Sequence, residues 1–146
     1  MRSRGERGDH GQTSLLIIGF AVVGLLVIVV VVDASAAYLR RQALDSLADG
    51  AALAAADGVQ SEQIYLGGLG ERAQLDPAVA HSYAAEYLAA SGAAGRYPGL
   101  RFSVQTSAEV VVVRVTAPLE MPFSPPGWAA DATVTGTAAS YVAVGD

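Results

Sequence analysis

The chain lacks cysteine altogether, and this absence bounds its chemistry. Without thiols it has neither disulfide bonds nor cysteine-based metal sites, and thiol catalysis is excluded. Lysine is also absent, so all nine basic residues are arginines, and the net charge is −5. Binding to a nucleic-acid backbone needs a basic surface, so this charge argues against nucleic acid as a partner.

Aromatic residues are few, at 7% of the chain, although hydrophobic residues make up 52%. Alanine and valine supply much of the hydrophobic content, which is typical of a membrane segment joined to a domain of small residues. The two histidines are His10 and His81. No nucleophile elbow, metal-binding motif or carboxylate pair surrounds either one, so the sequence predicts no catalytic residue, metal site, cofactor or small-molecule substrate.

Charged residues are missing from one long stretch near the N-terminus, Leu15–Val32. As a helix, this stretch would span roughly 27 Å, close to the hydrocarbon thickness of a bilayer. Residues 1–14 carry three arginines and two acids, whereas residues 33–146 carry six arginines and twelve acids. Arginines before the apolar stretch favour a cytoplasmic N-terminus. We predict a single-pass plasma-membrane protein with a cytoplasmic tail (1–14), a transmembrane helix (15–32) and an extracytoplasmic remainder.

The residues after Val32 allow two interpretations. Ala34 and Ala36 match an A-x-A signal-peptidase site, so cleavage near Ala36 would release a secreted soluble binding domain. Alternatively, the helix continues outside the membrane, because strong helix formers follow and the apolar stretch is longer than a usual signal core. We favour the continuous helix, with residues 33–57 as its extracytoplasmic part and Asp57-Gly58 as its end.

Small and aliphatic side chains recur along one narrow stripe of residues 33–57. We predict that this stripe contacts either a sheet of the same chain or a partner helix. Its members are Ala37, Leu44, Leu47, Ala51 and Ala55. Arg41 and Asp45 lie four residues apart, which favours an ion pair on the water-facing side.

Residues 58–146 predict a small α+β extracytoplasmic domain. Residues 58–76 contain three closely spaced glycines and no clear periodicity, so we predict a connecting loop there. Asp76-Pro77 begins a second helix, because Asp suits the cap and Pro suits the first position, and Gly92 ends it. The apolar face of this helix is formed by Val79, Ala80, Tyr83, Ala84, Tyr87 and Leu88.

Three further segments, 101–107, 109–118 and 132–144, have the composition and alternation of β-strands, and the first two form a hairpin. In the last strand, Gly136 marks either a bulge or a close backbone approach. The proline-rich residues 118–131 predict a loop or arm. We expect its Phe123 and Trp128 to pack under the sheet rather than to contact a partner.

These elements together predict an α+β fold of the kind found in pilin-like proteins. A long N-terminal transmembrane helix continues outside and packs, with the second helix, on a small antiparallel sheet of about three strands. Three strands expose an apolar face that other elements must cover, and the two helices are the covers that the chain offers.

The stretch from Gly11 to Gly58 resembles the N-terminal module of TadE/TadG-type proteins of the tight-adherence (Flp) pilus system. These proteins pair "RG(N/Q)" before an apolar segment with a downstream pattern "VD…A…(R/Q)…L…AAD(A/G)AALAAA". The matching residues are Arg7, Gly11, Gln12, Asp33, Tyr38, Leu39, Arg41, Leu44, Ala48, Asp49, Gly50 and residues 51–56. The remainder resembles the small ectodomain of short actinobacterial versions.

The resemblance implies a membrane-anchored, non-catalytic accessory component of a Tad/Flp-type pilus or secretion apparatus. Its implied partners are the membrane and other apparatus proteins, contacted helix to helix. Longer TadG proteins carry a large metal-ion adhesion domain, for which 146 residues leave no room. Type IV pilins and TadE-type pseudopilins present Glu five residues into the mature apolar segment. In this chain the position holds Leu16 after a cut at Gly11, or Thr13 after a cut at Gly8, so neither cut provides the Glu.

Overall fold

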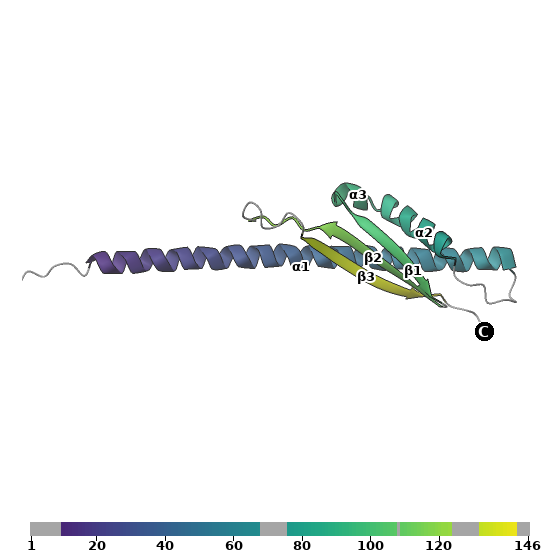
Figure 1. The fold of residues 1–146 in the computed structure, drawn as a ribbon, viewed down its shortest axis with the longest axis horizontal. Coiled ribbons are helices and arrows are strands. Elements are labelled where there is room, and N and C mark those ends of the chain that lie inside the picture. Colours follow the sequence, from purple (N-terminus) through teal and green to yellow (C-terminus); the bar gives the residue numbers. More distant parts are fainter. Residues whose placement is uncertain (1–9, 68–75, 108, 124–131, 143–146) are drawn as a thin grey trace, which may run out of the picture.

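The computed structural model describes residues 10–67, 76–107, 109–123 and 132–142. The strands form one antiparallel sheet in the order β1-β2-β3. The predicted α+β fold, with a long N-terminal helix, a second helix and a three-stranded antiparallel sheet, is confirmed (Figure 1). In chain order the elements are α1 (His10–Gly67), α2 (Pro77–Ala90), α3 (Ala93–Arg96), β1 (Arg101–Ser107), β2 (Val110–Pro118) and β3 (Thr133–Tyr141).

Helix α1 is a single helix of 58 residues, about 87 Å long. Its N-terminal half extends beyond the rest of the chain (Figure 1), and no residue of the apolar stretch 15–32 is buried. The helix then passes through residues 33–57 without a break, as predicted. By length and composition, α1 is able to cross a membrane.

The prediction that α1 ends at Asp57-Gly58 is wrong, because the helix continues to Gly67. Gly58 is buried, and a Cβ atom there would overlap the ring of Tyr83 on α2. Glycine therefore lets an aromatic ring pack on the helix backbone, and it does not form a left-handed cap. The predicted loop is likewise wrong for residues 58–67, while residues 68–75 lie outside the described residues.

Helix α2 begins and ends where the sequence predicts. The Asp76 carboxylate accepts a hydrogen bond of 2.8 Å from the Ala78 backbone N–H, and Pro77 occupies the first turn. Gly92, one residue past the C-cap, has a φ of 69°, the left-handed conformation that glycine adopts without strain. The buried face of α2 consists of Ala80, Ala84 and Leu88.

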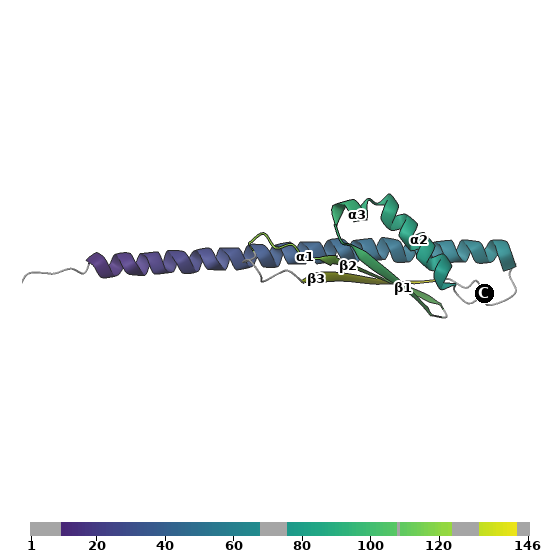
Figure 2. The ribbon, with the colours of Figure 1, turned by 45° about the horizontal axis from the view of Figure 1, so that its top comes forward.

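The sheet has one covered face and one exposed face. On β2, Val111, Val113, Val115 and Ala117 are fully buried, whereas Arg114 between them is exposed, so the predicted alternation is confirmed. Helix α1 contacts β2 and β3 on the covered face, and α2 contacts α1 and β1 (Figure 2). The other face presents polar side chains to solvent, as is common in antiparallel sheets. Among these exposed side chains are Ser103, Gln105, Arg114 and Thr137.

The expectation that Phe123 packs under the sheet is wrong, because its side chain is 54% exposed. The chain leaves β2 along α1 instead of turning beneath the sheet, and the Phe123 backbone N–H donates to Asp33. Trp128, the other aromatic residue of this connection, lies outside the described residues. The last strand is shorter than predicted, since β3 ends at Tyr141.

Substituting Gly58 tests how closely α1 and α2 pack. Helix propensity alone favours alanine by roughly 1 kcal/mol. Overlap with the Tyr83 ring opposes this, so we expect Gly58→Ala to lower the free energy of unfolding by about 1–3 kcal/mol. The measurement is chemical denaturation of the full chain in detergent, followed by circular dichroism. Gly95→Ala is the matched control, because nothing lies within 4 Å of a Cβ there. Equal stability of Gly58→Ala and the unmodified chain would contradict the packing.

Candidate functional site on helix α1

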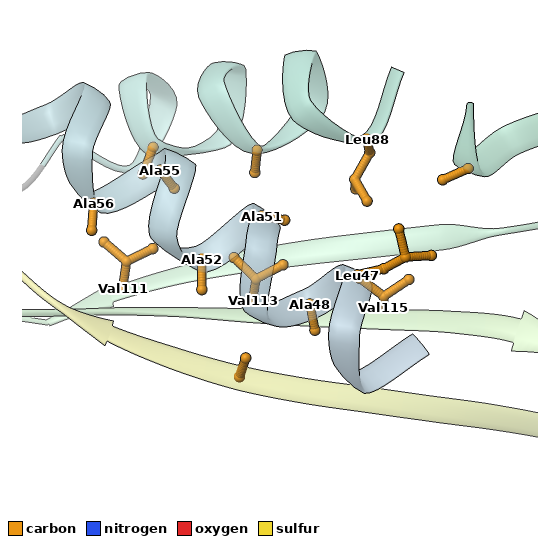
Figure 3. Packing of buried hydrophobic residues seen from close by; sticks show 14 of the residues in the cluster. Leu47, Ala48, Ala51, Ala52, Ala55, Ala56, Leu88, Val111, Val113 and Val115 are labelled. Atoms are coloured by element: carbon orange, nitrogen blue, oxygen red, sulfur yellow. The ribbon is translucent and has the colours of Figure 1, made fainter. Parts of the chain in front are cut away.

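The structure places most of the predicted stripe in the core. Leu44, Ala51 and Ala55 have no exposed side-chain surface, and Leu47 is 8% exposed. Figure 3 shows Leu47 and Ala51 among the β2 valines, with Leu88 of α2 nearby. Ala37 is half-buried and does not belong to this core cluster. Contact between the stripe and a partner helix stays a prediction.

The buried face of α1 is wider than the predicted stripe. Ala48, Ala52, Ala56 and Val59 are also buried, each at most 2% exposed. The extra width arises because α1 is covered from two directions, by the sheet and by α2 (Figures 2 and 3). The sequence signal for this second set is alanine repeating every four residues at positions 48, 52 and 56, which keeps one helix face small.

Two further glycines lie where a neighbouring element leaves no room for a Cβ atom. A Cβ atom on Gly136 would overlap the α1 backbone at Leu44 and Asp45, so β3 packs against that backbone. Pairing between β2 and β3 stays regular through Gly136, which selects close approach over a bulge. A Cβ atom on Gly50 would overlap the end of the Tyr87 side chain on α2. Glycine therefore permits close approach at two separate contacts, between β3 and α1 and between α1 and α2.

Asp45 attaches the edge strand β3 to α1. Its Oδ1 accepts a hydrogen bond of 3.2 Å from the Thr137 backbone N–H. The predicted ion pair between Arg41 and Asp45 is present at 4.0 Å, but both side chains are well exposed, so it contributes little to stability. The main contact of Asp45 is thus with a strand almost a hundred residues away in sequence.

A second set of contacts lies nearer the apolar half of α1. The Arg40 guanidinium carbon is 5.2 Å from the centre of the Tyr97 ring, and Arg40 Nη1 is 3.7 Å from Glu120 Oε2. The Arg40 side chain is only 16% exposed, whereas that of Glu120 is 75% exposed. Asp33 Oδ1 accepts a hydrogen bond of 3.2 Å from the Phe123 backbone N–H. The contacts of Glu120 and Phe123 attach the connection after β2, which begins at Leu119, to α1. The contact with Tyr97 attaches the end of α3 to the same part of α1.

Of the two histidines considered in the sequence, His81 makes a packing contact within the described residues. His81 is exposed on α2, and its ring stacks on Phe102 at a centroid distance of 4.8 Å. Within the described part of the chain, no three His, Cys, Asp or Glu side chains gather in a group that could hold a metal ion.

This geometry defines a class of protein: a long helix with an uncovered apolar half and an outer half that is the central element of a small α+β domain. Residues 11–58 match the Tad family model, "Putative Flp pilus-assembly TadE/G-like". The resemblance noted in the sequence is therefore confirmed for this segment. The match lies within α1 and ends before α2 and the sheet. No curated protein and no solved structure matches the chain significantly.

Removing the Asp45 side chain tests the attachment of β3. We expect Asp45→Ala to lower the free energy of unfolding by about 1 kcal/mol, because the Thr137 N–H loses its acceptor. Asp45→Asn keeps an acceptor oxygen and should retain most of the stability. Asp49→Ala, one helical turn further along an exposed part of α1, is the control and should be neutral. Equal losses at positions 45 and 49, measured by denaturant unfolding, would contradict a specific role for Asp45.

Proposed function

We propose that this protein is a membrane-anchored, non-catalytic, pilin-like accessory component of a Tad/Flp-type pilus or secretion apparatus. The observation that carries the proposal is the family match on residues 11–58, a segment that joins an uncovered apolar helix to the core of a small domain. In this proposal residues 1–14 are cytoplasmic and residues 15–32 cross the plasma membrane once. The outer half of α1 and residues 58–146 lie outside.

The exposed apolar half of α1 supports the membrane anchor. Large side chains such as Leu15, Phe20 and Leu25 are 64–74% exposed in the isolated chain. Covering a side chain of this kind is favourable by about 1.5–3 kcal/mol, and many of them lie in one segment, so a lipid environment stabilises it strongly. A helix also satisfies its own backbone hydrogen bonds, as a bilayer requires.

The shared core supports placing both parts of the chain on the same side of the membrane. The buried side chains of α1 between Leu44 and Val59 belong to the same cluster as the β2 valines and Leu88. Residues 33–57 therefore cannot be separated from residues 58–146 without exposing that core. We propose that α1 serves at once as membrane anchor and as the central element of the extracytoplasmic domain.

Partner contacts in this proposal fall on the part of α1 that the core leaves free. Ala37 is half-buried, while its neighbours Tyr38 and Leu39 are 69% and 62% exposed. The same part of the helix exposes Val31, Ala34, Ser35, Tyr38 and Leu39, which together form a mostly apolar surface. We propose that another membrane-anchored apparatus protein packs its helix here, because this surface continues the lipid-facing surface of the apolar segment.

Release by signal peptidase near Ala36 is the alternative, and the geometry favours it less. The peptide bonds around Ala36 lie inside an unbroken helix, whereas a signal peptidase needs an extended segment. Such a cut would remove Asp33, whose carboxylate accepts a hydrogen bond from the Phe123 backbone N–H of the folded domain. The buried part of α1 begins only at Leu44, so a released domain would keep its core, and experiment separates the two.

Anchoring and topology are tested together in cells. We expect the chain to stay in the membrane fraction after alkaline extraction, with a mass that includes residues 15–32. The lack of cysteine allows single-cysteine labelling, so Ser82→Cys, on an exposed position of α2, should react with a membrane-impermeant maleimide from outside. Ser3→Cys should react only after permeabilisation. A mature chain that begins at Ala37 and is free in the medium would overturn the anchored proposal.

Two substitutions separate a partner surface from the internal core. Leu39→Ala should leave the free energy of unfolding within about 0.5 kcal/mol, because the side chain is exposed. It should nevertheless reduce pilus assembly and co-purification of apparatus proteins several-fold. Ala51→Trp should instead lose about 1–3 kcal/mol of stability, because the site is fully buried. Normal assembly with Leu39→Ala would remove this surface from the proposal.

A further inference from the structure

Phe123 is an exposed aromatic residue beside the end of the apolar segment. Its backbone N–H lies 3.2 Å from Asp33 Oδ1, and Asp33 directly follows Val32, the last residue of the apolar run. The side chain itself is 54% exposed. If Leu15–Val32 spans the bilayer, then Phe123 lies at the depth where hydrocarbon gives way to headgroups.

Two attachments on one side of α1 hold the connection at this place. Arg40 pairs with Glu120, and Asp33 accepts from Phe123. Asp33 and Arg40 are seven residues apart, which is about two helical turns or 10 Å, so they lie on the same side of the helix. The connection after β2 therefore runs along α1 toward the apolar half (Figure 1). Its course is set by specific contacts at both points.

A backbone hydrogen bond also joins the two ends of the connection. The Leu119 N–H, directly after β2, donates to the carbonyl of Ala132, directly before β3, at 2.8 Å. Pro118 and Pro122 restrict the backbone of the outgoing arm. An aromatic side chain held on a restricted arm loses little conformational entropy when it is buried, so membrane contact is favourable there.

The chemistry of residues 119–123 selects the kind of surface that they fit. This segment contains Leu119, Met121 and Phe123, one acid at Glu120 and no basic residue. An electrostatic attraction to anionic headgroups needs Lys or Arg, so it is excluded for this segment. The apolar side chains of this segment instead fit insertion between lipids. Phe contributes to such insertion because aromatic and aliphatic side chains favour the boundary between headgroups and acyl chains.

We propose that the connection after β2 makes a second contact with the membrane, in which Phe123 inserts into the interfacial region of the outer surface of the lipid bilayer. This inference rests on the proposed anchoring of α1. The occupant is the bilayer itself, and zwitterionic lipid suffices. With two points of contact, the domain is restrained from rotating and tilting about α1, so the exposed face of the sheet keeps a constant orientation toward other apparatus proteins.

Tryptophan fluorescence in nanodiscs tests the insertion. The full chain carries one tryptophan, so Trp128→Phe provides a background without one. On that background we expect Phe123→Trp to have a blue-shifted emission, quenched several-fold in nanodiscs of phosphatidylcholine brominated near the headgroup end of its acyl chains. Tyr141→Trp is the matched control. Tyr141 is 78% exposed at the far end of the sheet, so it should be unquenched.

A third probe separates the failure of this inference from the failure of the anchor. Phe20→Trp reports on the apolar segment itself and should be quenched if α1 spans the bilayer. Quenching at position 20 without quenching at position 123 would overturn the second contact and leave the anchor in place. Absence of quenching at both positions would overturn both proposals. Quenching at position 123 that disappears in high salt would also contradict the apolar insertion proposed here.

Discussion

The structure depends on close packing between the alanine-rich outer half of α1 and the valine face of β2. Val111, Val113 and Val115 are fully buried by this contact. The apolar face of a sheet has to be buried against another element, and α1 is the main cover of β2 and β3. Gly136 brings β3 against the α1 backbone, and Asp45 accepts from the same strand. The helix that carries the uncovered apolar half is therefore also the element on which the domain folds.

This double use of α1 links the fold to the proposed function. In the proposed arrangement the domain is built on its own anchor without a flexible linker, so the helix would set the distance between the domain and the bilayer. The contacts of Arg40 and Asp33 with the connection after β2 extend the same arrangement toward the apolar half. The described residues offer packing surfaces and attachment points, which suits a structural part of an apparatus. The family match on residues 11–58 covers this shared helix.

Much of the fold is predictable because its signals are local. Asp76, Pro77 and Gly92 delimit α2 through backbone geometry within a few residues, and the alternation in β2 reports directly on a sheet with one covered face. The errors arise where a residue answers to a distant one. Gly58 has the composition of a helix end, but it lies under Tyr83, some 25 residues later. Phe123 was expected in the core because aromatic residues are scarce, yet its backbone is attached to Asp33.

Composition and periodicity over short windows are enough to predict the apolar run, the helical continuation beyond it, the second helix and the three strands. The packing of the elements in three dimensions shows what the stripe on α1 packs against, why Gly50 and Gly136 are glycines, and where the connection after β2 leads. Those features depend on which surfaces meet across large separations in the chain. Side-chain size and hydrogen bonding at the contact settle them, and neither is visible until the elements are placed together.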